Sequence, residues 1–288
     1  MSIVIEHLNY VYMQGGPYET RALDDVSLTI HDGEFIGLIG HTGSGKSTLV
    51  QHLNGLILPT SGKITVDGMD LAEKGTDRRA IRRRVGLVFQ YPENQLFEET
   101  VAKDIAFGPK NLGLGEEEID RRVRTAMRRV ALDYDKLAQR SVFELSGGQM
   151  RRVAIAGVLA MEPQTLVLDE PCAGLDPRGR EEILGLISDL HRESGATIVM
   201  VSHSMDDVAT LCNRILVMNG GRLEMDAAPA EVFRQGERLR AMHLDLPGAA
   251  RLRDKLNADG FDLPADVFTV ERIAEELLKR LKKGTETC

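Results

Sequence analysis

The stretch Gly40-His41-Thr42-Gly43-Ser44-Gly45-Lys46-Ser47 decides the fold, because it fits the pattern GxxxxGK[ST]. The apolar run FIGLIG (35–40) leads into it and STLVQHL (47–53) follows it, so the strand and the helix that this pattern requires are both present. Glycines let backbone N–H groups curve around a phosphate, and a helix N-terminus adds partial positive charge. These flanks argue against a glycine-rich turn that binds nothing.

We therefore predict a phosphate-binding loop for a nucleotide. Lys46 is expected to contact the β and γ phosphates, and the Ser47 hydroxyl to bind Mg²⁺. The remaining residues of the loop and the adjoining Thr48 are expected to contact the nucleotide as well.

Four near-continuous apolar runs predict a parallel sheet, since strands buried on both faces lack the alternation of half-exposed strands. Polar stretches with helical character lie between them, including 116–131 and 178–193. This alternation predicts an α/β fold, a P-loop NTPase core with a mostly parallel sheet. The runs are FIGLIG (35–40), VGLVF (85–89), TLVLDE (165–170) and TIVMVS (197–202).

The two ends of the chain have a different character. Residues 3–35 predict short strands in antiparallel hairpins, with turn residues between β-type runs. After about residue 228 the chain has short helical segments, broken at Leu246-Pro247-Gly248 and at Gly260. We predict a nucleotide-binding domain over 1–228, with a helical subdomain at about 91–160, and a small α-rich domain over 229–288.

Two carboxylates close one of the apolar runs, Leu166-Val167-Leu168-Asp169-Glu170. Asp169 at the strand end is placed to hold the Mg²⁺ shell, and Glu170 to polarise an attacking water. An ordinary solvated strand end is the alternative, and the phosphate loop argues against it.

The stretch Leu145-Ser146-Gly147-Gly148-Gln149, with MRRVAIAGVLAMEP after it, resembles the signature motif of ABC ATPases. A serine, two glycines and a helix N-terminus form a second cradle suited to phosphate. The resemblance implies that this cradle closes over the nucleotide held by the opposite subunit, so that hydrolysis requires a dimer.

Three further residues match this family in order and spacing. The resemblance implies that Gln90 senses Mg²⁺ and the γ phosphate and couples to the transport subunit, and that Asp176 communicates across the dimer. It also implies that His203 contacts the γ phosphate and pairs with Glu170. Tyr12 is the candidate for stacking on adenine, with Tyr10 and simple core packing as open alternatives.

Longer segments are similar to the energy-coupling factor transporter ATP-binding proteins, and most similar to the second of the two paralogous ATPase subunits. The likeness covers essentially the whole chain. One departure is Cys172, where the family usually has threonine; since neither residue is expected to bind Mg²⁺, we expect normal hydrolysis. The segments are 89–97, 100–114, 143–163, 169–180 and LPADVFTVERIAEELL (263–278).

The resemblance implies ATP and Mg²⁺ as cofactors and a place on the cytoplasmic face of the membrane as a peripheral subunit. The implied partners are a paralogous ATPase subunit, with a homodimer as the alternative, a transmembrane coupling protein, and small membrane subunits that bind vitamins or other micronutrients. Residues 90–110 are expected to dock the coupling protein. A conventional importer or exporter ATPase stays open as an alternative.

Composition narrows the function classes. The net charge of −8 opposes binding to nucleic acid, and no run approaches the roughly 18 apolar residues of a membrane-spanning helix. The start of the chain lacks the pattern of a secretory signal, so we expect a cytosolic compartment. Three cysteines, Cys172, Cys212 and Cys288, lack CxxC spacing and predict reduced thiols rather than a disulfide framework or a zinc site.

Two classes from outside transport are less consistent with the sequence. Soluble ABC proteins that act on ribosomes or DNA usually carry two cassettes or a long insertion, and residues 48–145 are too few for one. A nucleotide-binding regulator without turnover would not need Glu170 and His203.

Two basic clusters, 78–84 and 121–129, remain. In the second, Ile119, Val123, Met127 and Val130 recur at helical spacing, which predicts that the arginines form the wet face of an amphipathic helix. A docking surface for an acidic partner or lipid headgroups is the alternative.

Overall fold

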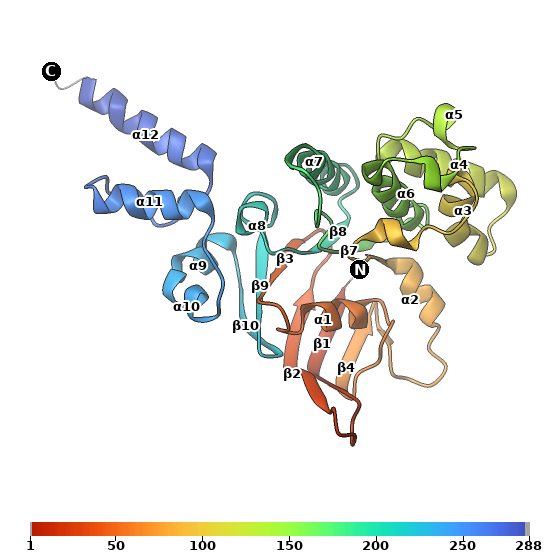
Figure 1. Cartoon of the computed structure of the whole chain (residues 1–288). Helices are drawn as coiled ribbons and strands as arrows, with labels where there is room; N and C mark the ends of the chain where they lie inside the picture. Colours follow the sequence, from red (N-terminus) through yellow and green to blue (C-terminus); the bar gives the residue numbers. More distant parts are fainter. Residues whose placement is uncertain (1, 286–288) are drawn as a thin grey trace.

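The computed structural model describes residues 2–285. Figure 1 shows two sheets, a group of helices on one side of them and further helices from the C-terminal part of the chain on the other. The strands are β1 (Ile3–Tyr12), β2 (Thr20–Ile30), β3 (Phe35–Ile39), β4 (Ser61–Val66), β5 (Met69–Asp70), β6 (Val85–Val88), β7 (Thr165–Asp169), β8 (Thr197–Val201), β9 (Arg214–Asn219) and β10 (Arg222–Ala227). The helices are α1 (Lys46–Leu53), α2 (Arg78–Arg84), α3 (Val101–Asn111), α4 (Glu116–Arg129), α5 (Tyr134–Leu137), α6 (Gly147–Leu159), α7 (Pro177–Ser194), α8 (Met205–Leu211), α9 (Pro229–Arg234), α10 (Gly236–Ala241), α11 (Gly248–Ala258) and α12 (Val270–Thr285), with 3₁₀ turns η1 (Pro92–Gln95) and η2 (Val142–Glu144).

The larger sheet has six strands in the order β10-β9-β3-β8-β7-β6. All neighbours are parallel except β10, which pairs antiparallel with β9. Every residue of β3, β6, β7 and β8 is buried, which confirms the predicted parallel sheet and its α/β class. Because these four strands run in one direction, the loops that follow them meet at the same edge of the sheet.

The smaller sheet is antiparallel, in the order β2-β1-β4-β5. The predicted antiparallel pairing of the opening region is confirmed, but the prediction of short strands is wrong. Strands β1 and β2 have ten and eleven residues, because β1 is paired along both edges, with β2 and with β4. Register shifts within β1 let these long strands twist while they remain paired.

Apolar residues bury both faces of the larger sheet. On one face, Leu49, Val50 and Leu53 of α1 share a cluster with the smaller sheet and with β3. On the other face, helices α3, α4, α6, α7 and α8 form a second cluster. Helix α1 and the loop before it are therefore fixed between the two sheets.

Helix α4 is amphipathic, as predicted, with Val123 and Met127 buried. The prediction that all arginines of 121–129 lie on the wet face is wrong for Arg122, whose side chain is 7% exposed. Its guanidinium lies 2.7 Å from Glu118 and 2.9 Å from Glu162, so two carboxylates compensate its burial.

The C-terminal part of the chain packs in two ways. Helices α9 and α10 add Val232, Phe233 and Leu239 to the larger cluster, whereas α11 and α12 enclose a small cluster of their own. The predicted breaks between helices at 246–248 and at 260 are both present. Cys172 and Cys212 are free thiols, and Cys288 lies outside the described residues. Within residues 2–285, no helix combines the length and the apolar character needed to cross a membrane.

Candidate functional site

The predicted phosphate loop connects the end of β3 to the start of α1. Gly43 and Gly45 have φ angles of 81° and 102°, in the left-handed region where other residues are strained. A Cβ at Gly45 would also lie 2.6 Å from the carbonyl oxygen of Ala22. The backbone therefore favours glycine at both positions, and the sequence pattern specifies the glycine at 45.

Lys46 is folded back over this loop. Its side chain is buried, and its Nζ donates to the carbonyl oxygens of Gly40 at 2.7 Å and His41 at 3.0 Å. Burial lowers the pKa of Lys46, and the charges of Glu170 and Asp169 oppose this shift. The Oγ of Ser44 is buried with no hydrogen-bond partner among the described residues. A buried ammonium group and an unpaired hydroxyl in a glycine loop fit a phosphate group.

Glu170 is held between the loops that follow β6 and β8. Gln90 Nε2 donates to Glu170 Oε2 at 3.1 Å, and His203 Nε2 lies 2.8 Å from Glu170 Oε1. Glu170 itself has a φ of 51°, an uncommon conformation for a residue other than glycine. The expected contact of His203 with Glu170 is present, and Gln90 joins the same carboxylate from the other side.

Asp169 ends β7 and is 8% exposed. Burial raises its pKa, while a hydrogen bond from the Ser47 hydroxyl and the charge of Lys46 lower it. The Asp169 carboxylate and the Ser47 hydroxyl are oxygen ligands of the kind that Mg²⁺ prefers, and Mg²⁺ usually takes only one or two ligands from protein. The amide of Gln90 contacts Glu170, the residue next to Asp169. Among the described residues no group of three His, Cys, Asp or Glu could hold a metal alone, so phosphate oxygens would have to complete the coordination.

The four residues Ser146 to Gln149 form a capping box at the start of α6. Gln149 N donates to Ser146 Oγ, and Ser146 N donates to Gln149 Oε1. A Cβ at Gly147 or Gly148 would have no atom within 4 Å. Among the described residues, no hydrogen bond joins this segment to the phosphate loop or to Glu170.

Asp176 also caps a helix, since its Oδ1 accepts from Gly179 N at 2.7 Å at the start of α7. Capping alone accounts for an aspartate at this position in the isolated chain.

Arg151 on α6 is a residue that the sequence analysis missed. It is 2% exposed, and its guanidinium donates to both carboxylate oxygens of Glu93, at 2.7 and 3.0 Å. It also donates to the carbonyl oxygens of Pro171 at 3.1 Å and Ala173 at 2.8 Å. Arg151 therefore joins the helix after the signature segment to the segments that follow Gln90 and Glu170. The sequence alone does not distinguish Arg151 from its neighbour Arg152.

The structure distinguishes the two tyrosines at the end of β1. Tyr12 is 38% exposed, and its hydroxyl lies 3.2 Å from Thr48 Oγ1 in the first turn of α1. Tyr10 is partly buried and packs edge to face against Tyr12 and His52. Of these two tyrosines, Tyr12 is the one that presents an exposed ring next to the phosphate loop.

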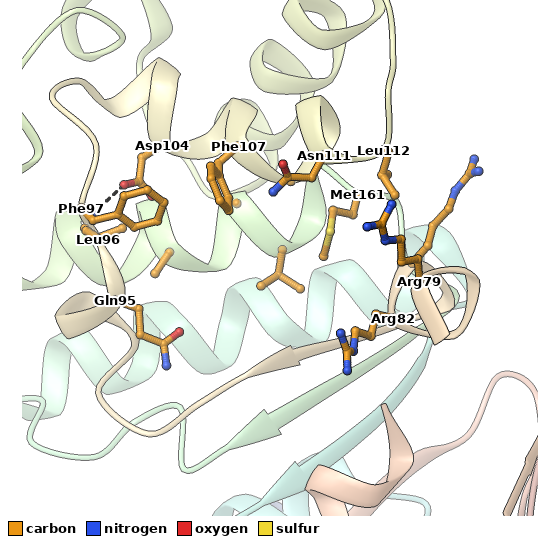
Figure 2. Close-up of a pocket in the computed structure, with 15 residues that line it drawn as sticks. Arg79, Arg82, Gln95, Leu96, Phe97, Asp104, Phe107, Asn111, Leu112 and Met161 are labelled. Carbon is orange, nitrogen blue, oxygen red and sulfur yellow. Dashed lines mark hydrogen bonds between the residues drawn. The ribbon is translucent and has the colours of Figure 1, made fainter. Parts of the chain in front are cut away.

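A groove of about 620 Å³ lies between α2, η1, α3 and α6. Figure 2 shows Phe97 and Phe107 along it, with Arg79 and Arg82 of α2 at one end. Phe97 and Phe107 are 58% and 43% exposed and pack edge to face. Exposed aromatic rings in a groove are typical of a docking site for a protein partner.

Cys172 is partly buried, with its Sγ 4.0 Å from the carbonyl oxygen of Arg180, and burial raises its pKa to about 11. We expect Cys172→Thr to leave ATP turnover within about twofold of the original chain, because a hydroxyl of similar size fits the site. A phosphate-release assay checks this, and a sharply different rate would show that the thiol has a part in the reaction.

Comparisons with known proteins agree on one family. The sequence profile of the family described as ABC transporter matches residues 23–173. The Energy-coupling factor transporter ATP-binding protein EcfA2 of Clostridium tetani is 56% identical over 288 residues, covering 100% of both chains. The protein of the same name from Clostridium perfringens is 55% identical over 284 residues, covering 99% of this chain and 100% of its own.

Two solved structures share the fold. The structure of cbiO1 from Clostridium perfringens, part of the ABC transporter complex cbiONQ, has a TM-score of 0.72 and 41% identity, over 88% of this chain and 98% of its own. An ATP-binding cassette solved as a dimer in a post-hydrolysis state, bound to ADP and Pi, has a TM-score of 0.70 and 29% identity, over 79% and 98%.

Proposed function

The chain belongs to the ABC transporter family, and within it to the energy-coupling factor transporter ATP-binding proteins, and we propose that it powers uptake of vitamins or other micronutrients through separate membrane subunits. It binds ATP and is an ABC-type ATPase. The proposed place of work is the cytoplasmic face of the membrane, as a peripheral subunit.

The observation that carries the ATPase chemistry of the proposal is Glu170 beside the phosphate loop, contacted by Gln90 on one oxygen and His203 on the other, whereas the transport role rests on the full-length similarity to the energy-coupling factor proteins. A carboxylate in this position can accept a proton from the water that attacks the γ phosphate. Gln90 and His203 keep the carboxylate directed at that water. Mg²⁺, held by Ser47, Asp169 and Gln90, would neutralise charge on the phosphate oxygens.

The nucleotide contacts that we propose come from two surfaces. On this subunit, the phosphate loop and Thr48 hold the phosphates, with Lys46 leaving its loop carbonyl partners for phosphate oxygens, and Tyr12 stacks on adenine. From a second ATPase subunit, the signature segment closes over the same nucleotide, and Asp176 signals between the sites. The loop residues are Gly40, His41, Thr42, Gly43, Ser44, Gly45, Lys46 and Ser47, and the signature residues are Ser146, Gly147, Gly148 and Gln149.

A dimer is supported by the exposure of the signature segment and the open space over its two glycines. The second subunit that we propose is a paralogue, with a second copy of this chain as the alternative.

We also propose the division into a cassette over 1–228, with a helical subdomain at about 91–160, and a C-terminal domain over 229–288.

Lys46→Ala is expected to weaken ATP binding by about 10- to 100-fold, since it removes a charged donor from the phosphates. Equilibrium titration with a fluorescent ATP analogue measures this. Lys63→Ala is the matched control, because Lys63 is half exposed and lies outside the loop, and its variant should bind normally. If Lys46→Ala bound ATP as tightly as the original chain, Lys46 would not contribute to ATP binding.

The groove in Figure 2 is the proposed docking site for a helix of the transmembrane coupling protein, within residues 90–110 and their neighbours. We expect Phe97→Ala with Phe107→Ala to abolish co-purification of the membrane partner, because exposed aromatic rings dominate such contacts. ATP binding should be unchanged. Phe261→Ala, at a ring of similar exposure outside the groove, is the control. Intact assembly of the double variant would contradict this docking site.

The function is tested by purifying the tagged chain gently from native membranes and identifying its companions. A paralogous ATPase, one polytopic coupling protein and assorted small membrane proteins are expected. A single dedicated permease would indicate a conventional transporter instead. Ribosomes, or no membrane protein, would overturn the transport role and leave the ATPase chemistry standing.

A further inference from the structure

Four residues behind the phosphate loop contact one another in a closed circuit, namely Tyr10, Tyr12, Thr48 and His52. The Tyr12 hydroxyl lies 3.2 Å from Thr48 Oγ1, and the Thr48 carbonyl oxygen lies 2.7 Å from His52 Nδ1. The rings of His52 and Tyr10 are 4.9 Å apart, and those of Tyr10 and Tyr12 are 4.8 Å apart, both edge to face. Strand β1 and helix α1 are thereby joined twice, by the contact of Tyr12 with Thr48 and by that of Tyr10 with His52. Thr48 follows Lys46 and Ser47 directly.

Burial of the side chains increases from one side of this circuit of residues to the other. Tyr12 is 38% exposed, whereas Thr48 is 8% and His52 is 0% exposed. Tyr10, partly buried, fills the space between Tyr12 and His52. The exposed tyrosine therefore rests on a packed support that is continuous with the helix carrying the phosphate loop.

His52 is an unusual residue for this interior position. Burial lowers its pKa, and the backbone groups of Thr48 and Leu58 oppose that shift only in part, so the ring is neutral near pH 7. The contact with the Thr48 carbonyl requires the proton on Nδ1, which leaves Nε2 as an acceptor with no hydrogen-bond partner within the described residues. A buried nitrogen without a hydrogen bond costs free energy. A histidine held here by its Nδ1 contact alone therefore suggests that the orientation of the imidazole serves a purpose.

We propose that Tyr10 and His52 are positioning residues for the adenine ring of ATP, which act by holding the Tyr12 ring at a fixed angle beside the phosphate loop. This inference rests on the proposed function, in which Tyr12 stacks on adenine. A ring held in place before the nucleotide arrives loses no rotational freedom on binding, which strengthens the contact. The support contributes to recognition of the base and not to recognition of the phosphates.

That difference gives the test. The full chain and its variants are titrated by calorimetry with two ligands, the non-hydrolysable adenylyl imidodiphosphate and inorganic tripolyphosphate. Tyr12→Leu should weaken the adenine ligand by about tenfold or more, and Tyr10→Leu and His52→Leu by about three- to tenfold. Tripolyphosphate should bind all three variants as it binds the original chain. Tyr10→Phe keeps the ring and should restore the original ratio of the two affinities.

A purely structural role would weaken both ligands together, and this result would overturn the inference. The inference would also be overturned if Tyr12→Leu weakened only the adenine ligand and Tyr10→Leu and His52→Leu weakened neither ligand. That result would leave the proposed contact of Tyr12 with adenine intact. An unchanged ratio in Tyr12→Leu would refute the adenine contact itself. If His52→Leu melts at a much lower temperature, its affinities report on stability, and the inference is then tested by comparing Tyr10→Leu with Tyr10→Phe.

Discussion

Glu170→Gln is expected to lower ATP turnover by about 100- to 1000-fold while the chain still binds ATP, because positioned proton transfer contributes on this scale. The amide has the size of the carboxylate but cannot accept a proton from water. The contacts of Glu170 with Gln90 and His203 involve both of its oxygens, so the substitution keeps the shape of the site and removes its charge.

Phosphate release at saturating ATP measures turnover, and titration with the fluorescent analogue measures binding. Glu73→Gln, at an exposed carboxylate outside the site, is the matched control and should behave as the original chain. Turnover of the Glu170 variant near the original rate would assign the base to another residue. Loss of binding together with turnover would mean that Glu170 holds the nucleotide site together.

Arg151→Met is expected to lower the free energy of unfolding by about 3 kcal/mol, since removing one member of a buried ion pair leaves the other uncompensated. The variant leaves Glu93 without its guanidinium, and the carbonyl oxygens of Pro171 and Ala173 without a donor. Turnover should fall as well, because these carbonyls belong to the segment directly after Glu170. Urea denaturation and phosphate release measure the two effects.

Arg178→Met is the control, since the Arg178 side chain is 88% exposed and its loss should change stability by less than about 0.5 kcal/mol. The partner residue provides a second check. Although burial favours the neutral acid, hydrogen bonds from Arg151 lower the pKa of Glu93 below its ordinary 4.5. The pair therefore stabilises the chain above this value and loses its contribution as the pH falls through the lowered pKa. If Arg151→Met and Arg178→Met unfold alike, Arg151 does not join these segments.

The sequence predicts the parallel sheet well because burial on both faces leaves a local signal, an unbroken apolar run. It also predicts which loops meet, since parallel strands place their carboxyl ends together. Gln90 and Glu170 are 80 residues apart and still form the hydrogen bond that this topology implies. Strand β4 lacks such a run, because its first three residues are exposed and only Ile64 and Val66 are buried, and β5 has just two residues.

Side-chain partners across elements leave no such local signal. Arg151 and Arg152 are adjacent in the sequence, and only the packing of α6 decides that the first is buried against Glu93, which lies 58 residues away. Tyr10 and Tyr12 are two residues apart on one strand, and so point to the same face. They meet helix α1 differently, since His52 packs against the ring of Tyr10 whereas Tyr12 contacts Thr48 through its hydroxyl and stays 38% exposed.

Gly147 and Gly148 have a consequence for the evolution of stability. Their backbone φ angles are not among the positive ones, and a side chain at either position would meet nothing. Alanine there would restrict the unfolded chain and stabilise the isolated subunit by about 0.4–1 kcal/mol at each position. Folding of the single chain would thus favour alanine. A requirement for glycine would come from the assembled state, in which the second subunit that we propose would place its nucleotide in the open space. In the proposed dimer, the two glycines would mark a place where the most stable monomer and the working assembly require different residues.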